Sequence, residues 1–138
     1  MRLRKDAKIE LISRVPLFEG LSGSHLGKVA RLADEIDVRE GKELTREGER
    51  GEEFFVLVEG EAVVRRKGRK VGTLGSGDFF GEIALVADTP RTATVATTAE
   101  SRVLVITRRG FQELLRDTPA VQVRVLEALA KRVAPQTI

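Results

Sequence analysis

Cysteine, tryptophan and tyrosine are all absent from this 138-residue chain. Without cysteine, the protein cannot form a disulfide, a thiolate metal site or a cysteine nucleophile. Histidine occurs once, at His25, and a single histidine cannot form a histidine-rich metal centre. Carboxylates alone would suit only a hard cation that prefers oxygen ligands. We therefore expect no metal site in this protein.

Long apolar runs are also missing. No stretch of about 18 apolar residues occurs, so we expect no transmembrane span. The N-terminus, MRLRKDAKIE, is charged and lacks the apolar stretch of a signal peptide. The resulting expectation is a cytoplasmic protein with no membrane partner. The length fits one domain over residues 1–138.

A large excess of either charge is lacking too. The chain has 24 basic and 21 acidic residues, a formal net charge of +3. The densest basic run, residues 65–70, is divided by Gly68, which predicts the tip of a β-hairpin with solvated charges. A nucleic-acid surface usually needs a recognition element or stacking aromatic residues as well. We therefore expect no direct nucleic-acid binding by this chain.

The hydrophobic pattern divides the chain into three blocks. Residues 6–34 show helical spacing, and residues 36–107 are rich in β-branched side chains with frequent glycines, which predicts many short strands. Residues 108–134 return to helical spacing, as two helices separated just before Pro119. The expected fold class is mainly β with flanking helices, as a sandwich, barrel or jelly roll.

Local signals place the second helix of the first block. Leu26, Val29 and Ala33 recur at intervals of three and four, which predicts one buried helical face. A serine before this run, Ser22 or Ser24, can cap the helix by accepting a backbone hydrogen bond.

One segment inside the strand-rich block breaks the strand pattern. Gly81 stands directly before residues 82–85, which predicts a single helical turn whose unpaired backbone N–H groups favour an anion. Arg91 can return over this turn and pair with a phosphate through two parallel hydrogen bonds, and Thr92 adds a hydroxyl. Glu82 would repel an anion, so we expect it to accept a hydrogen bond from a sugar hydroxyl. A surface loop with a stray arginine is the alternative.

Enzyme classes find little support in the motifs. Gly75, Gly77 and Gly81 are spaced G-x-G-x-x-x-G, one residue too long for the dinucleotide fingerprint, and no βαβ pattern surrounds them. The P-loop motif GxxxxGK[ST] does not occur. A cupin-like enzyme needs clustered metal ligands, and a serine hydrolase needs a base near a strained nucleophile turn. We expect no enzyme activity and no cofactor.

The segment FGEIALV…TPRTATV closely resembles the phosphate-binding cassette of cyclic-nucleotide-binding domains, which occur in protein kinase A regulatory subunits, nucleotide-gated channels and bacterial catabolite activator proteins. VPLFEGLS is similar to the segment that precedes the family's β-roll, and EGERGEEFFVLVEGEAVV is similar to its central strand pair. The resemblance covers nearly the whole chain. It implies a double-stranded β-helix, the jelly-roll barrel, with a helical N-terminal segment and two C-terminal helices.

The resemblance also implies a role for individual residues. Glu82 would accept a hydrogen bond from the ribose 2′-hydroxyl, and Arg91 would neutralise the cyclic phosphate. Further ligand contacts are implied for Phe80, Gly81, Ile83, Ala84, Thr92 and Ala93. A hydroxyl at Thr92 is compatible with either purine and leaves the choice of base open. Cyclic AMP is the expected ligand, and cyclic GMP is the alternative.

The last helix is the element that family members often place over the base. It has no aromatic residue here, so the candidate base caps are Arg124, Leu126, Leu129 and Arg132. Its apolar stripe, which includes Leu126, would pack against its own domain or form a homodimer. The resemblance implies a sensor that moves its C-terminal helices to regulate an unnamed effector. The alternatives are a ligand-free interaction or dimerisation module, and the sensor part of a truncated transcription factor, channel or enzyme.

Overall fold

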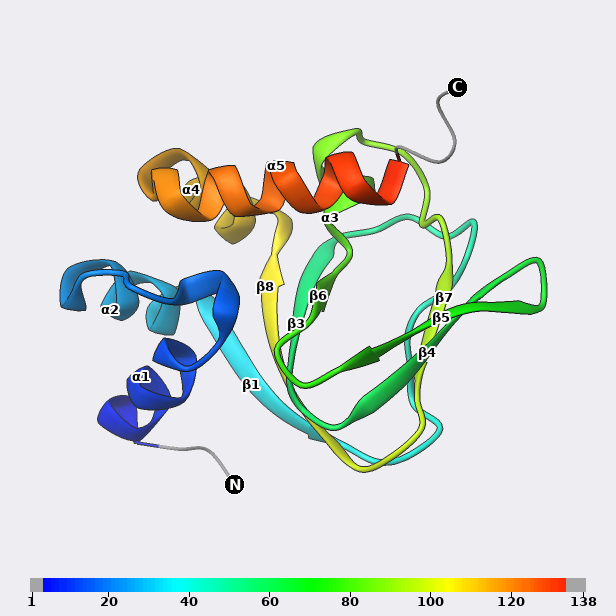
Figure 1. Ribbon diagram of the computed structural model, residues 1–138, viewed down its shortest axis with the longest axis horizontal. Helices are drawn as coiled ribbons and strands as arrows, with labels where there is room; N and C mark the ends of the chain where they lie inside the picture. The colour runs from blue at the N-terminus through cyan, green and yellow to red at the C-terminus, as the bar shows by residue number, and fades with distance from the viewer. Residues whose placement is uncertain (1–3, 134–138) are drawn as a thin grey trace.

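The structure is a computed structural model that describes residues 4–133. Two four-stranded sheets face each other, and every strand pair in them is antiparallel (Figure 1). One sheet has the strand order β1-β8-β3-β6 and the other has the order β2-β7-β4-β5. The strands are β1 Ala33–Val38, β2 Glu43–Thr45, β3 Glu53–Glu59, β4 Glu61–Arg66, β5 Arg69–Gly75, β6 Phe79–Phe80, β7 Thr94–Thr97 and β8 Ser101–Thr107.

The helices gather on the side of the β1-β8-β3-β6 sheet, and one short helix is inserted between strands (Figure 1). They are α1 Lys5–Ser13, the 3₁₀ turn η1 Pro16–Phe18, α2 Gly23–Leu32, α3 Glu82–Val86, α4 Arg108–Asp117 and α5 Pro119–Val133. The hydroxyl of Ser22 caps α2 by accepting a hydrogen bond from the backbone N–H of His25 at 3.2 Å. Of the two predicted caps, Ser22 is therefore the one used.

The boundary between the first helical block and the sheet differs from the prediction. Ala33 was expected on the helix, but α2 ends at Leu32 and Ala33 is the first residue of β1. The reason is that residues 33–38 pair with β8 along their whole length, which competes with continuation of the helix. The predicted change from strand to helix after residue 107 is confirmed, because α4 begins at Arg108. Residue 134, expected at the end of the last helical block, lies outside the described residues.

Strand β3 is buried on both faces, which explains its unbroken apolar run FFVLV. Phe54 and Val56 pack with the helices, and the ring of Phe54 stacks on Phe111 of α4 at a centroid distance of 4.4 Å. Phe55 and Leu57 face the opposite sheet and pack in the interior of the roll. The sheet that contains β3 is therefore a shared layer between the helices and the roll.

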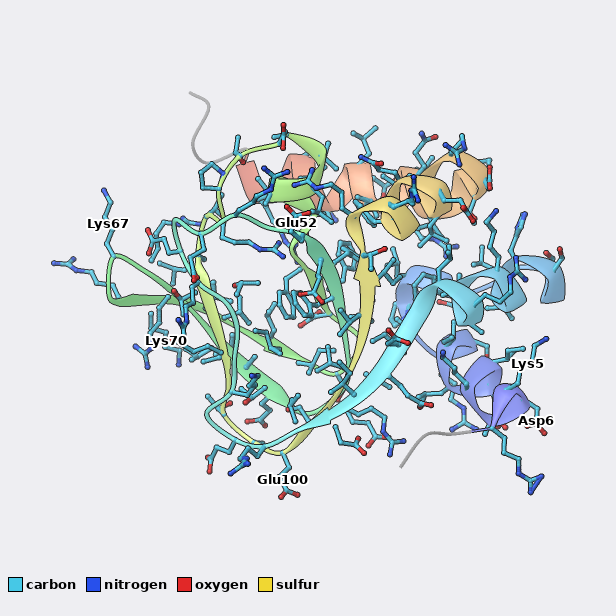
Figure 2. The ribbon with its side chains drawn as sticks, turned by 180° about the vertical axis from the view of Figure 1, so that it is seen from behind. Lys5, Asp6, Glu52, Lys67, Lys70 and Glu100 are labelled. Carbon is cyan, nitrogen blue, oxygen red and sulfur yellow. The ribbon has the colours of Figure 1, made fainter. Side chains whose placement is uncertain are left out.

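The mainly β fold class with flanking helices is confirmed. The two sheets form the β-roll, and no closed hydrogen-bonded barrel joins them within residues 4–133. Strands β4 and β5 form the hairpin predicted from the basic run, and its turn residues Lys67 and Gly68 have φ angles of +54° and +77°. The side chain of Lys67 points away from the body at this tip (Figure 2). Across the described part of the chain, every helix is too short or too polar to cross a bilayer.

Candidate functional site

A cavity of about 780 Å³ lies between α3, the β4–β5 hairpin and α5. This volume falls within the usual range for small-molecule sites. The structure brings together all the residues that the sequence predicted for ligand contact, because each of them lines this cavity: Phe80, Gly81, Glu82, Ile83, Ala84, Arg91, Thr92 and Ala93. Their contacts with a ligand are predictions.

The short helix α3 begins where the sequence predicted a helical turn. Gly81 precedes it with φ +96° and ψ −3°, a left-handed conformation that glycine adopts without the steric penalty of other residues. A Cβ at this position would lie 2.8 Å from Nη1 of Arg91 and 2.9 Å from the carbonyl oxygen of Glu53. Both the backbone angle and the lack of space therefore require glycine at the entrance to α3.

Arg91 is held inside the cavity wall with 7% of its surface exposed. Its Nη1 donates to the carbonyl oxygen of Gly81 at 3.0 Å, and its Nη2 donates to the carbonyl oxygen of Glu53 at 2.5 Å. Burial is the main cause that lowers the pKa of Arg91, although the guanidinium stays charged near neutrality. Its partners among the described residues are carbonyl oxygens rather than a paired carboxylate, so its charge remains available to an anion.

The loop before β3 fixes the position of Arg91. The backbone N–H of Arg91 donates to the Glu49 carbonyl at 2.8 Å, and the N–H of Gly48 donates to the Arg91 carbonyl at 2.9 Å. A Cβ at Gly51 would lie 2.7 Å from Cζ of Arg91 and 2.9 Å from Cβ of Ala84. The sequence analysis missed Gly51, because nothing local separates it from the other loop glycines. Its role depends on a contact with a residue forty positions later in the chain.

Glu82 is fully buried, with 0% of its surface exposed. Its Oε1 accepts a hydrogen bond and forms an ion pair with Nη1 of Arg132 on α5. Its Oε2 is buried and has no hydrogen-bond partner in the described part of the chain. A buried acceptor without a donor costs free energy, so this oxygen is suited to a donor that a ligand brings.

The four candidate base caps lie in different surroundings. Arg132 lines the cavity, its Nη2 donates to the carbonyl oxygen of Phe79, and its guanidinium lies 5.2 Å from the centroid of that ring. Arg124 points elsewhere and donates to the carbonyl oxygen of Leu17 at 2.8 Å. Leu129 packs against the main core. Of the four, the structure therefore brings only Arg132 to the cavity.

The predicted apolar stripe of the last helix packs against its own domain only in part. Val121 and Val125 are buried, with 0% and 2% of their surface exposed, but Leu126 is 64% exposed. The buried line of α5 follows positions four residues apart, from Val121 to Val125 and Leu129, and Leu126 lies off this line. Leu126 therefore neither packs in the core nor lines the cavity.

The wall formed by β4 and β5 was missed by the sequence analysis. Val64, Arg66 and Leu74 all line the cavity from these strands. Arg66 belongs to the basic run that was interpreted as wholly solvated. Ala62, Val64 and Arg66 follow one another at intervals of two residues, a pattern that predicts a shared, inward-facing side of β4. No group of metal-binding side chains occurs among residues 4–133.

The fold is a jelly-roll module of two facing antiparallel sheets with a cavity at its edge. A short helix is inserted in it ahead of a buried arginine. The sequence model of the family described as "Cyclic nucleotide-binding domain" matches residues 35–118 of this chain. The chain belongs to this family. The matched residues include α3, Arg91, the β4–β5 hairpin and α4, and therefore most of the cavity wall.

Individual relatives agree with this assignment. The cAMP-dependent protein kinase regulatory subunit of Mycosarcoma maydis is 42% identical over 113 residues, which are 73% of this chain and 21% of the relative. A cyclic nucleotide-gated potassium channel of Rhizobium etli is 35% identical over 127 residues, 91% of this chain and 36% of the relative. The cAMP-bound structure of PfPKA-R has a TM-score of 0.82 and 27% identity, over 97% of this chain and 48% of that one. The chain thus spans about a fifth to a third of these two curated relatives.

Proposed function

We propose that this chain acts as one domain that binds a 3′,5′-cyclic nucleotide, mainly cyclic AMP, and serves as a sensor rather than an enzyme. One observation carries the proposal: two buried ions face one cavity with unmet bonding capacity. The hydrogen-bond acceptors of Arg91 among the described residues are carbonyl oxygens, and Oε2 of Glu82 has no donor there. A cyclic nucleotide carries the two complementary groups, an anionic phosphate and a neighbouring 2′-hydroxyl.

In this proposal, Arg91 binds the phosphate of the ligand. A guanidinium has five N–H donors, and the two carbonyl contacts of Arg91 occupy one donor on each terminal nitrogen. The remaining donors can form charge-assisted hydrogen bonds with phosphate oxygens, which are about twice as strong as neutral ones. Burial in the wall reduces competition from water for these bonds.

In this proposal, Glu82 binds the ribose of the ligand. Its Oε1 is already paired with Arg132, so the carboxylate charge is compensated before any ligand enters. Its Oε2 can then accept the ribose 2′-hydroxyl proton while the ion pair with α5 stays in place. This arrangement explains how an acid can stand in an anion site without repelling the phosphate.

The relatives support cyclic AMP as the ligand. The fungal relative is named for its dependence on cAMP, and the PfPKA-R structure was determined with cAMP bound. Thr92 is exposed at the cavity and adds a hydroxyl that suits either purine, so cyclic GMP stays the alternative ligand. The effector is either another part of the same protein or a separate partner. The named relatives illustrate its class, a kinase or a channel.

We propose that the C-terminal helices respond to ligand binding and transmit it to the effector. Arg132 links α5 to Glu82, and Arg108 at the start of α4 donates to the carbonyl oxygens of Gly51 at 2.7 Å and Leu85 at 3.4 Å. Ligand contact at Glu82 therefore acts on a residue that already holds α5, and α4 is tied through Arg108 to the loop at Gly51 and to α3. We infer that binding changes the position or the stability of α5.

Calorimetric titration with cyclic AMP, cyclic GMP and linear 5′-AMP tests the binding proposal. We expect cyclic AMP to bind more tightly than cyclic GMP, and 5′-AMP to bind far more weakly because its extra charge and open phosphate do not fit. Hydrogen exchange of residues 119–132 in the same samples tests the output, with slower exchange expected in the bound state. Absence of heat with either cyclic nucleotide would refute the function, and unchanged exchange on binding would refute the role of α5.

A homodimer through α5 is a second candidate with its own observation. Val123 and Leu126 are 51% and 64% exposed and stand three residues apart on the helix, so they share one face. Sedimentation at micromolar concentration, with and without cyclic AMP, tests this candidate against the double variant Val123→Ser/Leu126→Ser. A dimer that the variant abolishes is the expected result for this candidate, and a monomer throughout would exclude it.

A further inference from the structure

The β4–β5 wall contains one charged side chain that turns inward. Along β4, Ala62 is buried, Val64 is half-buried and packs with the roll interior, and Arg66 is half-buried and lines the cavity. Its neighbour Arg65 is exposed and is not among the cavity-lining residues. Because side chains alternate along a strand, these two adjacent arginines face opposite sides of the same hairpin.

Arg66 is held at the cavity by a hydrogen bond. Its Nε donates to the carbonyl oxygen of Thr92 at 2.9 Å. This bond joins the hairpin to the residue that directly follows Arg91, across an interval of 26 residues. Within residues 4–133, its two terminal nitrogens have no acceptor, so their N–H groups stay free. The side chain is thus fixed at one end and available at the other.

Arg66 lies on the hairpin wall of the cavity, where we place the base of the proposed ligand. The phosphate and sugar are assigned to Arg91 and Glu82 on the α3 side of the cavity. The opposite wall offers aliphatic side chains, Val64 and Leu74, which suit the faces of a planar base. Among the cavity-lining residues of β4 and β5, Arg66 is the one with a charged side chain. A base that extends from the sugar toward this wall presents its polar edge to that guanidinium.

From this placement we infer that Arg66 reads the purine edge that carries N7. This inference rests on the proposed function and names a residue that selects among its ligands. A guanidinium donates to N7 of either purine, and it donates in addition to O6 of guanine, whereas adenine presents an amino donor at position 6. Arg66 therefore adds affinity for cyclic AMP through N7 and adds more for cyclic GMP.

The test compares cyclic AMP, cyclic GMP and 7-deaza-cyclic AMP, which lacks N7, on three variants of the chain. Arg66→Ala removes the guanidinium, and Arg66→Lys keeps the charge but loses the planar pair of donors. Arg65→Ala is the matched control, because it removes the same charge from the adjacent, outward-facing position. Affinities are measured by calorimetry, and thermal unfolding checks that each variant is folded.

In the unaltered chain and in Arg65→Ala, we expect 7-deaza-cyclic AMP to bind about fivefold more weakly than cyclic AMP, the lower range for one specific base contact. In Arg66→Ala, we expect the two to bind equally, and cyclic GMP to lose about fivefold more affinity than cyclic AMP. In Arg66→Lys, we likewise expect cyclic GMP to lose about fivefold more affinity than cyclic AMP.

Each outcome decides between the claims. If the 7-deaza analogue and cyclic AMP differ by the same factor with and without the Arg66 guanidinium, Arg66 does not contact N7 and this inference fails alone. If cyclic GMP and cyclic AMP lose equal affinity in Arg66→Ala, Arg66 does not read the edge that carries O6. If the unaltered chain binds no cyclic nucleotide, the proposed function fails, and this inference fails with it.

Discussion

The two walls of the cavity are built in different ways. On the sides of Gly51 and Gly81, the Arg91 guanidinium leaves no room for an added side chain, because a Cβ at either glycine would stand within 3 Å of it. On the opposite wall, a Cβ at Gly72 of β5 would meet no heavy atom within 4 Å. Preorganised groups bind without a further ordering cost, whereas an open wall gains affinity only from the contacts a ligand brings. The Arg91 side therefore decides whether a cyclic nucleotide binds, and the hairpin side adjusts which base is preferred.

The largest effect is expected from Arg91→Ala, which removes the phosphate partner and leaves a buried anion without its charge-assisted hydrogen bonds. We expect the affinity for cyclic AMP to fall by roughly a hundredfold. Calorimetry measures the loss, and Arg46→Ala, at an exposed arginine outside the cavity, is the control. A loss below about fivefold would mean that another group holds the phosphate.

An intermediate effect is expected from Gly51→Ala, which adds one methyl group to the crowded wall. Its Cβ would lie 2.7 Å from Cζ of Arg91, so the guanidinium must shift from its two carbonyl partners. We expect about a tenfold loss of cyclic AMP affinity. The matched variant is Gly72→Ala on the open wall, where a smaller change is expected. Equal losses in the two variants would contradict the difference between the walls.

The smallest effect is expected from Glu82→Gln, because Arg91 still holds the phosphate while the single, uncharged amide oxygen can accept from either Arg132 or the ribose hydroxyl. We expect about a fivefold loss for cyclic AMP, the difference between a charged and a neutral acceptor. The loss should be smaller for 2′-deoxy-cyclic AMP, which has no hydroxyl to donate. Calorimetry of both ligands on both proteins gives the coupling between Glu82 and the 2′-hydroxyl. Equal losses for the two ligands would place the sugar away from Glu82.

The sequence predicts the fold well where the signals are local. The β4–β5 turn, the serine cap of α2, the start of α4 and the helical turn after Gly81 each depend on neighbouring residues. The segment around Arg91 is also predictable, because a glycine, a short helical turn, an acid and an arginine occur in a fixed order. Ala33 was assigned to the wrong element because helical spacing continues into a segment whose pairing with β8 is a long-range contact.

The rest of the site depends on contacts between distant residues. The crowding of Arg91 by Gly51, and the hydrogen bond from Arg66 to Thr92, join segments that are 40 and 26 residues apart. Neither leaves a local pattern in the sequence. The choice of Arg132 over Leu126 depends on the rotation of α5 about its axis, which is set by packing of Val121 and Val125 in the core. The full burial of Glu82 follows from the same packing of α5 over α3.

A crystal structure of the chain with cyclic AMP tests the central claim most directly. The account predicts phosphate oxygens within hydrogen-bond distance of the Arg91 guanidinium, and the ribose 2′-hydroxyl on Oε2 of Glu82, with little movement of Gly51 and Gly81. A phosphate bound away from Arg91, or a sugar that leaves Oε2 of Glu82 without a donor, would contradict it.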